Sequence, residues 1–253
     1  MSVFTVVLIG LFLPLFPFSM LFNHLSERFK HPLTRIGLLL FWPQLGVVLF
    51  FLLGSKPPAW VLPWAALTAL LYGFRLLTQR DVNGWVGFLA SSAWSLLWFP
   101  LLADGEQVIL MTYALGFSIP LILMALLAVS LEQRFGAAYT HLYGGLAATM
   151  PRFSGVLVCS TLAAIATPVF PAFFTMLEIL LLTGPLIAVL VLLTWLSWSW
   201  AGVRLLQGLL VGAETQAGGI MEVSDLSRGL SRAFALILTL LALSGLWLTG
   251  GLS

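Results

Sequence analysis

Long apolar stretches separated by short polar segments run through the whole chain. The longest stretches reach or exceed the roughly 20 residues that a helix needs to cross the hydrocarbon core of a bilayer. The pattern predicts an all-α, polytopic membrane protein, a single transmembrane domain over residues 1–253 with eight spanning helices. The predicted spans are residues 2–22, 35–54, 59–78, 84–103, 107–131, 153–182, 185–211 and 233–250.

One predicted span carries both a break and a charge. Pro168 and Pro171 interrupt the stretch from Phe153 to Leu182, and Glu178 follows them. Backbone groups freed by proline inside a bilayer are tolerated only where they are buried in protein or line a wet cavity. An ionisable residue in such a segment indicates function. Glu178 is therefore a candidate proton or cation site. The alternative is a carboxylate near the membrane edge that caps or pairs with a loop.

Three further positions carry local expectations. Gln44, beside Pro43, is a second polar group at membrane depth; we expect it to bond backbone freed by Pro43, with pathway lining as the alternative. Cys159 is the single cysteine and is expected to be a packed core thiol. The linker over residues 212–231 is the longest predicted loop, and its Ser224-Asp225 pair is expected to cap a short helix there.

Tryptophan is abundant, with ten residues in the chain. Trp60, Trp85, Trp98 and Trp247 lie near span ends, which is typical of the aromatic belts at membrane interfaces. The cluster Trp195, Trp198 and Trp200 lies in the middle of a predicted span, which favours packing against lipid or a partner.

Charge supports the membrane assignment and orients it. Only 8% of the residues are charged and 60% are hydrophobic, whereas soluble proteins carry about 25% charged residues. The positive-inside rule then predicts both termini on the outer face, and thus a multi-pass protein of a bacterial inner membrane. One side of the predicted topology receives Lys56 alone, and the other receives Arg28, Lys30, Arg35, Arg75, Arg80, Arg134, Arg152, Arg204, Arg228 and Arg232.

The sequence shows no pattern typical of a soluble enzyme. His24, His31 and His141 each stand alone in a loop without the spacing of metal ligands, so we expect no metal and no cofactor. Because the basic residues are dispersed through short loops, we expect the lipid bilayer as a partner and no nucleic acid. Catalysis by the chain itself is not expected.

Three ordered stretches resemble one family of membrane proteins. These stretches are Tyr72-Gly73 followed by Gln79-Arg80-Asp81-Val82; Glu132-Gln133-Arg134 followed by Gly144-Gly145-Leu146 and Pro151; and Thr161-Leu162-Ala163 followed by Pro168, Phe173-Phe174 and Glu178-Ile179-Leu180. They are similar to the antiporter-like membrane subunits of complex I (NADH:quinone oxidoreductase), Mrp-type cation/proton antiporters and membrane-bound hydrogenases.

The resemblance implies part of a larger fold. The family has fourteen helices in two inverted repeats with a central line of ionisable residues, and this chain corresponds to the last eight helices. Residues 59–211 resemble the second repeat. The family's ionisable positions fall here on apolar residues, namely Phe12, Phe41, Leu115 and Met176. Because a proton relay needs titratable groups or water within reach, a complete relay through this chain is not expected.

Two functions remain open from the sequence. In the first, the chain is a shortened, degenerate antiporter-like subunit that packs against other membrane subunits, such as a full-length paralogue. It would be a scaffold or coupling subunit of a respiratory, hydrogenase-type or inorganic-carbon uptake complex, with a subunit of a proton-translocating oxidoreductase as one such role. In the alternative, it is itself a proton or sodium transporter that uses Glu178 and a hydrated path. The meagre polar content at depth favours the first.

Overall fold

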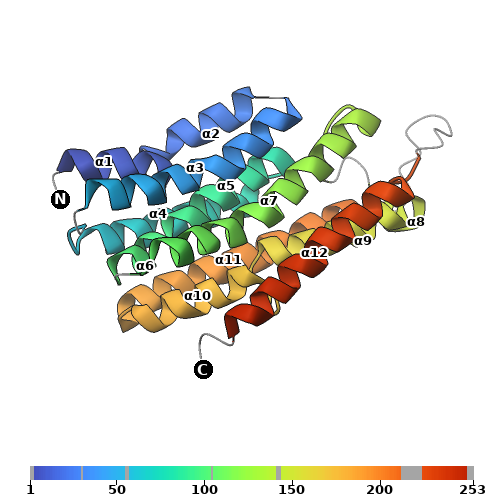
Figure 1. Ribbon diagram of the computed structural model, residues 1–253. Coiled ribbons are helices and arrows are strands. Elements are labelled where there is room, and N and C mark those ends of the chain that lie inside the picture. The colour runs from blue at the N-terminus through green and yellow to red at the C-terminus, as the bar shows by residue number, and fades with distance from the viewer. Residues whose placement is uncertain are drawn as a thin grey trace.

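The computed structural model describes residues 3–29, 31–54, 57–103, 105–140, 144–211 and 224–249, and it is built from helices (Figure 1). This confirms an all-α, polytopic membrane protein. Six segments of the described chain are long and apolar enough to cross a bilayer: α3, α4, α5 with α6, α7, α11 and α12. The helices are α1 (Val3–Phe12), α2 (Ser19–Arg28), α3 (Pro32–Leu53), α4 (Val61–Thr78), α5 (Val82–Ser95), α6 (Trp98–Leu102), α7 (Gln107–Phe135), α8 (Leu146–Thr149), α9 (Pro151–Ala164), α10 (Pro171–Leu182), α11 (Pro185–Leu210) and α12 (Arg228–Thr249).

Two pairs of short helices complete the bundle, and each pair is interrupted by proline. The predicted break at Pro168 and Pro171 is confirmed, because α9 ends at Ala164 and α10 begins at Pro171. A continuous first span was wrong: α1 ends at Phe12, and α2 begins only at Ser19. Pro14 and Pro17 lie between them, and proline supplies no N–H for a helix. If each broken pair of helices crosses the membrane once, the protein has eight spans, which is the predicted number. The number of spans stays a prediction.

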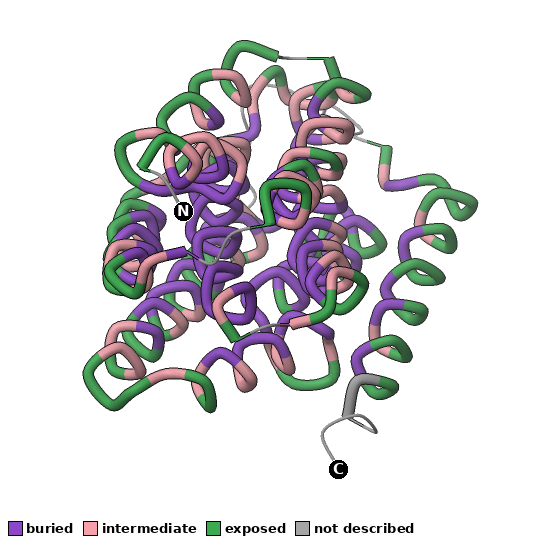
Figure 2. Tube along the Cα trace, turned by 60° about the vertical axis from the view of Figure 1, so that its left-hand side comes forward, coloured by how far each residue is buried: buried purple, intermediate pink, exposed green. Residues whose placement is uncertain are grey.

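The segment formed by α5 and α6 lies at the centre of the bundle. Nearly all of its residues are buried, whereas α3 and α12 bury few of theirs. The side chain of Asp81 starts α5 by accepting a hydrogen bond from the Gly84 amide at 3.1 Å, as N-cap residues do. Around this centre α11 packs along α4, and α3 packs along α7. Figure 2 shows the buried positions gathered in the middle of the bundle.

Helix α12 lies at the edge of the bundle and presents one narrow stripe to it. Its buried residues, Phe234, Leu238, Leu241 and Gly245, recur every three or four positions, which places them on one face of a helix. In Figure 2 this helix, which leads to the C-terminal label, is a mostly exposed column beside the rest. Because the exposed face is rich in leucine, it suits contact with lipid or with another membrane protein.

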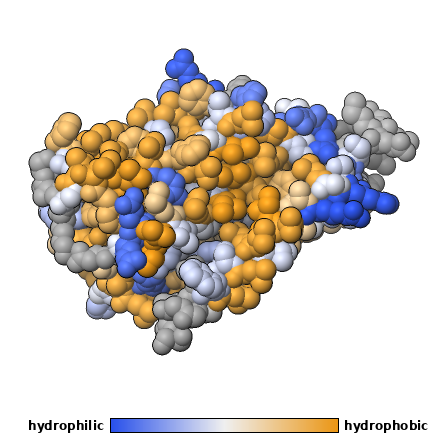
Figure 3. All heavy atoms as spheres, viewed as in Figure 1, coloured by the Kyte–Doolittle hydropathy of each residue, from blue (hydrophilic) through white to orange (hydrophobic). Residues whose placement is uncertain are grey.

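One face of the bundle is mostly apolar and carries its largest polar region at one end. Figure 3 shows apolar residues over most of the visible face, with a polar region at the right-hand end, where Figure 1 places the start of α9 and of α12. This distribution is typical of a protein that spans a bilayer, where only the ends meet water.

Cys159, expected to be packed, is exposed on α9, because the helix turns that position away from its neighbours.

The end of the linker is docked onto the start of α9. Asp225 accepts hydrogen bonds from the amides of Arg152 at 2.9 Å, Phe153 at 3.0 Å and Leu226 at 2.7 Å. The expected cap within the linker was wrong, because Asp225 caps α9, where Arg152 lies 73 residues earlier in the chain. Ser227 accepts from Leu230 at 3.2 Å, so α12 begins at Arg228, inside the predicted linker. Residues 212–223 of the linker lie outside the described residues.

The charge of Asp225 is stabilised by this arrangement. Partial burial acts to raise the pKa of its carboxyl group, but the three amide donors and the charge of Arg152 outweigh that effect. The pKa of Asp225 therefore lies below its ordinary value. An anion at the N-terminus of a helix also interacts favourably with the helix dipole.

Candidate functional site

The break between α9 and α10, residues 165–170, is the centre of the predicted site. Ala166 and Val169 both adopt positive φ angles, 58° and 89°. Such angles are unfavourable for residues with a side chain and most of all for a β-branched one. The strained backbone leaves carbonyl oxygens without helical partners, and within a bilayer these groups must be satisfied by other parts of the protein or by water.

A tryptophan from α11 bonds the freed carbonyl groups between α9 and α10. We call this the second break, and the break between α1 and α2 the first. The indole nitrogen of Trp195 lies 3.2 Å from the oxygen of Ile165 and 3.2 Å from the oxygen of Ala166, and it donates to both. The ring of Phe173, on the first turn of α10, packs edge-on against Trp195 with 5.5 Å between ring centroids. Trp195, which was predicted to pack against lipid or a partner, therefore bonds the broken backbone inside the protein.

Three glycines let neighbouring helices approach the second break closely. A methyl group on Gly245 of α12 would overlap the carbonyl oxygen of Val169. A methyl group on Gly202 of α11 would lie 2.9 Å from the side chain of Ile165, and one on Gly116 of α7 would lie 3.0 Å from Pro171. Small residues allow such close packing of helices in membranes. The break is thus packed from three helices.

The break between α1 and α2, residues 13–18, is closed in the same manner, and the sequence did not reveal it. Two indole nitrogens donate to its carbonyl oxygens, Trp98 to Leu13 at 3.1 Å and Trp64 to Phe16 at 2.8 Å. A third, that of Trp42, donates at 3.0 Å to the oxygen of Leu11 in the last turn of α1. The amide of Phe16 donates to the hydroxyl of Thr68 at 3.1 Å. Trp98 is fully buried, so its assignment to an interfacial belt was wrong, and so was that of Trp85, which is 1% exposed.

The buried polar side chains of the described residues are almost all uncharged. They are serines and threonines, with Arg35 as the one charged member. Several bond one another or the backbone: Ser19 pairs with the hydroxyl of Tyr72 at 2.7 Å, and Trp198 donates to Ser92 at 2.8 Å. The interior near the breaks therefore consists of hydroxyl and indole groups rather than acids and bases.

Glu178 and Gln44 both reach the same turn of α7. Glu178, half-buried on α10, accepts a hydrogen bond from the hydroxyl of Tyr113. The side-chain nitrogen of Gln44 donates to the carbonyl oxygen of Met111 at 3.1 Å. The expectation that Gln44 bonds backbone near Pro43 was therefore wrong, because its partner is on another helix. These two side chains tie α10 and α3 to α7.

The four apolar positions at which the family resemblance places ionisable residues have different surroundings. Met176 is fully buried, and Phe12 packs against Trp42 with 5.0 Å between ring centroids. Leu115 is half-buried, while Phe41 is 60% exposed on the outer face of α3. The structure thus does not place all four in one interior line.

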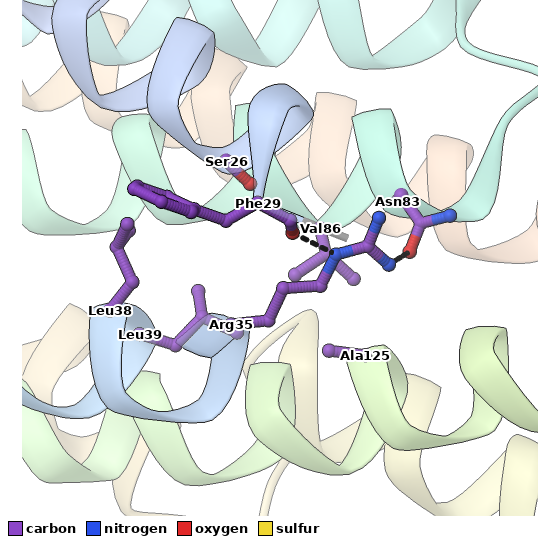
Figure 4. A pocket seen from close by; sticks show the side chains of 8 residues that line it. All are labelled: Ser26, Phe29, Arg35, Leu38, Leu39, Asn83, Val86 and Ala125. Atoms are coloured by element: carbon purple, nitrogen blue, oxygen red, sulfur yellow. Dashed lines mark hydrogen bonds between the residues drawn. The ribbon is translucent and has the colours of Figure 1, made fainter. Parts of the chain in front are cut away.

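A polar network near the end of α2 is the other chemically notable feature, and sequence reasoning missed it. Figure 4 shows the guanidinium group of Arg35 between the carbonyl oxygen of Phe29 and the side chain of Asn83. Arg35 donates to Phe29 at 2.9 Å and to Asn83. Asn83 in turn donates to Glu132 at 2.6 Å, and Arg35 lies 3.9 Å from the same Glu132 oxygen. These partners explain how an arginine persists in a buried position.

Sequence comparison finds a relative of nearly the same length. No protein-family model matches the sequence. A protein of Aquifex aeolicus (strain VF5), described as uncharacterized, is 24% identical over 235 residues, which cover 91% of this chain and 95% of that protein.

Three solved structures are similar in fold to this chain. A chain of respiratory complex I from Thermus thermophilus matches with a TM-score of 0.75 and 22% identity, covering 94% of this chain and 52% of that one. A chain of the Mrp complex from Dietzia sp. DQ12-45-1b matches with a TM-score of 0.80 and 12% identity, covering 98% and 56%. A chain of the membrane-bound sulfane sulfur reductase, an archaeal respiratory membrane complex, matches with a TM-score of 0.80 and 18% identity, covering 96% and 51%.

The resemblance noted from sequence motifs is thus confirmed at the level of the fold. This chain spans about half the length of each solved chain that it matches. The protein has the fold of about half of a membrane subunit of the complex I, Mrp and sulfane sulfur reductase type.

Proposed function

We propose that this chain is a shortened antiporter-like subunit that serves as a scaffold or coupling element of a larger ion-translocating membrane complex. The solved chains that share its fold come from two respiratory complexes and an Mrp complex. The larger complex would be a respiratory, hydrogenase-type or inorganic-carbon uptake complex. Its partners would be other membrane subunits, including a full-length paralogue, in a bacterial inner membrane.

The observation that carries this proposal is the closure of both helix breaks by tryptophan. A carbonyl oxygen that already accepts from an indole is less available to coordinate a cation or to order a chain of water. At the second break Trp195 occupies the oxygens of Ile165 and Ala166, and at the first break Trp98 occupies that of Leu13. A transporter needs titratable or hydrated groups at this depth, and the closed breaks therefore favour a structural role.

Reconstitution of the purified chain tests this function. The chain alone, in liposomes with an imposed pH gradient, should show no more proton or sodium flux than protein-free liposomes. The same chain, purified gently from its native membrane, should retain other membrane subunits in fixed ratio. Cation-dependent proton flux through the chain alone would overturn the scaffold role and support the alternative, a transporter that uses Glu178 and a hydrated path.

A further inference from the structure

A polar cleft of about 390 Å³ opens beside the Arg35 network, away from both helix breaks. Its walls come from α2, α3, α5, α7 and the segment over residues 136–139. The cleft lies at the end of the bundle where α2 ends, α5 begins and α7 ends, which is the end that carries most of the arginines. Its size falls in the range of about 300–1,000 Å³ that is common for binding sites.

The cleft is acidic although its surroundings are basic. Three carboxylates, of Glu27, Asp81 and Glu132, and one guanidinium group, of Arg35, line it, which gives a formal charge of −2. Arg28, Arg80 and Arg134 are sequence neighbours of these lining residues. Because a cleft lined by an excess of one sign of charge focuses the field of those charges, this cleft attracts a cationic group.

The arrangement of the acids favours an elongated cation over a metal ion. Within the described ranges, no group of three histidine, cysteine or acidic side chains is placed to hold a metal. Asp81 is engaged at the start of α5 by the amide of Gly84. Glu132 uses Oε1 for both its described contacts, with Asn83 and Arg35, and its side chain is 34% exposed. Glu27 is exposed at the rim.

The inner wall of the cleft already binds one guanidinium group. Asn83 and Glu132 face Arg35 from α5 and α7, and the C-terminal end of α2 supplies the Phe29 carbonyl oxygen. A carboxylate with a free oxygen beside an amide is suited to bind a further ammonium or guanidinium group. The chemistry of the occupant is therefore that of a lysine or arginine side chain.

We propose that the cleft receives a lysine or arginine side chain from a loop of a neighbouring membrane subunit. By the positive-inside rule, this arginine-rich end faces the cytoplasm, and the loops of any membrane partner on that side are also rich in lysine and arginine. At this end, an acidic cleft offers such a loop attraction instead of repulsion. The inference rests on the proposed function, because it needs a partner subunit.

Charge reversal at the rim tests the proposal. Glu27→Lys alters an exposed acid of the cleft, and Glu106→Lys alters an exposed acid before α7, outside the cleft, as the matched control. Tagged chains are purified from the native membrane, and the recovered partner is measured by quantitative mass spectrometry. Glu27→Lys should lower recovery of the partner at least roughly tenfold relative to Glu106→Lys, with both chains eluting as monodisperse species.

A cross-link then identifies the cation. A photoreactive residue at position 27 should link to a partner loop that contains lysine or arginine, and changing that residue to glutamate should restore recovery with Glu27→Lys. Unchanged recovery with Glu27→Lys, or a cross-link to a loop without a basic residue, overturns the cleft proposal and leaves the scaffold role intact. If the wild-type chain retains no membrane partner at all, the proposed function fails as well.

Discussion

Trp195 on α11 donates its indole hydrogen to the carbonyl oxygen of Ala166, 3.2 Å away, at a residue held with φ at 58°. The donor and the acceptor are 29 residues apart in sequence, and the bond joins two helices across the point where the α9–α10 backbone has no helical partner. The break is therefore a packed junction whose polar groups are bonded within the protein.

Removing this donor should destabilise the fold. Trp195→Phe keeps an aromatic ring but leaves the oxygens of Ile165 and Ala166 without their indole partner, and we expect a loss of about 1–2 kcal/mol in the free energy of unfolding. The loss of stability is followed as a fall in the fraction of detergent-purified protein that stays monodisperse after heating. Trp200→Phe is the control, because Trp200 is 62% exposed. Equal stability of the two variants would contradict a structural role for the indole donor.

Close packing of α12 on the second break gives a second prediction. Gly245→Ala places a methyl group against the Val169 carbonyl oxygen, so α12 must shift, with an expected cost of about 1–3 kcal/mol. Gly229→Ala on the same helix meets no atom within 4 Å, and it should be neutral or slightly stabilising because alanine favours helix. Heat stability of both variants is compared with that of the wild type. A Gly245→Ala protein as stable as Gly229→Ala would show that α12 does not hold the break.

Glu178 distinguishes the two functions. Glu178→Gln keeps an oxygen that accepts from the Tyr113 hydroxyl but removes the titratable group. In a scaffold, this change should leave both assembly and the ion transport of the whole complex at wild-type level. Transport is measured in inverted membrane vesicles that contain the assembled complex, with subunit content as the control. Loss of transport in a fully assembled Glu178→Gln complex would instead establish an ion site.

Docking of the linker should depend on pH through Asp225. The pKa of Asp225 is lower in the folded protein than its unfolded value of 3.8. The ionised carboxylate therefore contributes fully to stability above pH 3.8, and this contribution is lost as pH falls through the lower pKa of the folded state. Asp225→Asn removes the charge at every pH. Heat stability should therefore favour the wild type at pH 7, and the difference should shrink as the pH approaches 3. A difference that stays constant over this range would contradict the assignment.

The sequence alone determined the class of the protein and the break between α9 and α10, but it missed the break between α1 and α2. Apolar stretches of membrane length, sparse charge and the pair Pro168 and Pro171 are local signals, because they depend on residues next to one another in the chain. The same signals were available at Pro14 and Pro17, but there the apolar stretch reads as one continuous span. The ordered motifs also pointed to the fold that the solved structures confirm.

Only the tertiary structure decided what surrounds the breaks. Tryptophan in an apolar helix has the same sequence signal whether it faces lipid or donates to a distant carbonyl group, so neither Trp98 nor Trp195 was recognised as a donor. The partner of Gln44 and the assembly of Arg35, Asn83 and Glu132 likewise depend on which helices are neighbours. Hydropathy fixes which segments lie in the membrane, whereas hydrogen-bond partners are fixed by helix packing, which brings together residues far apart in sequence.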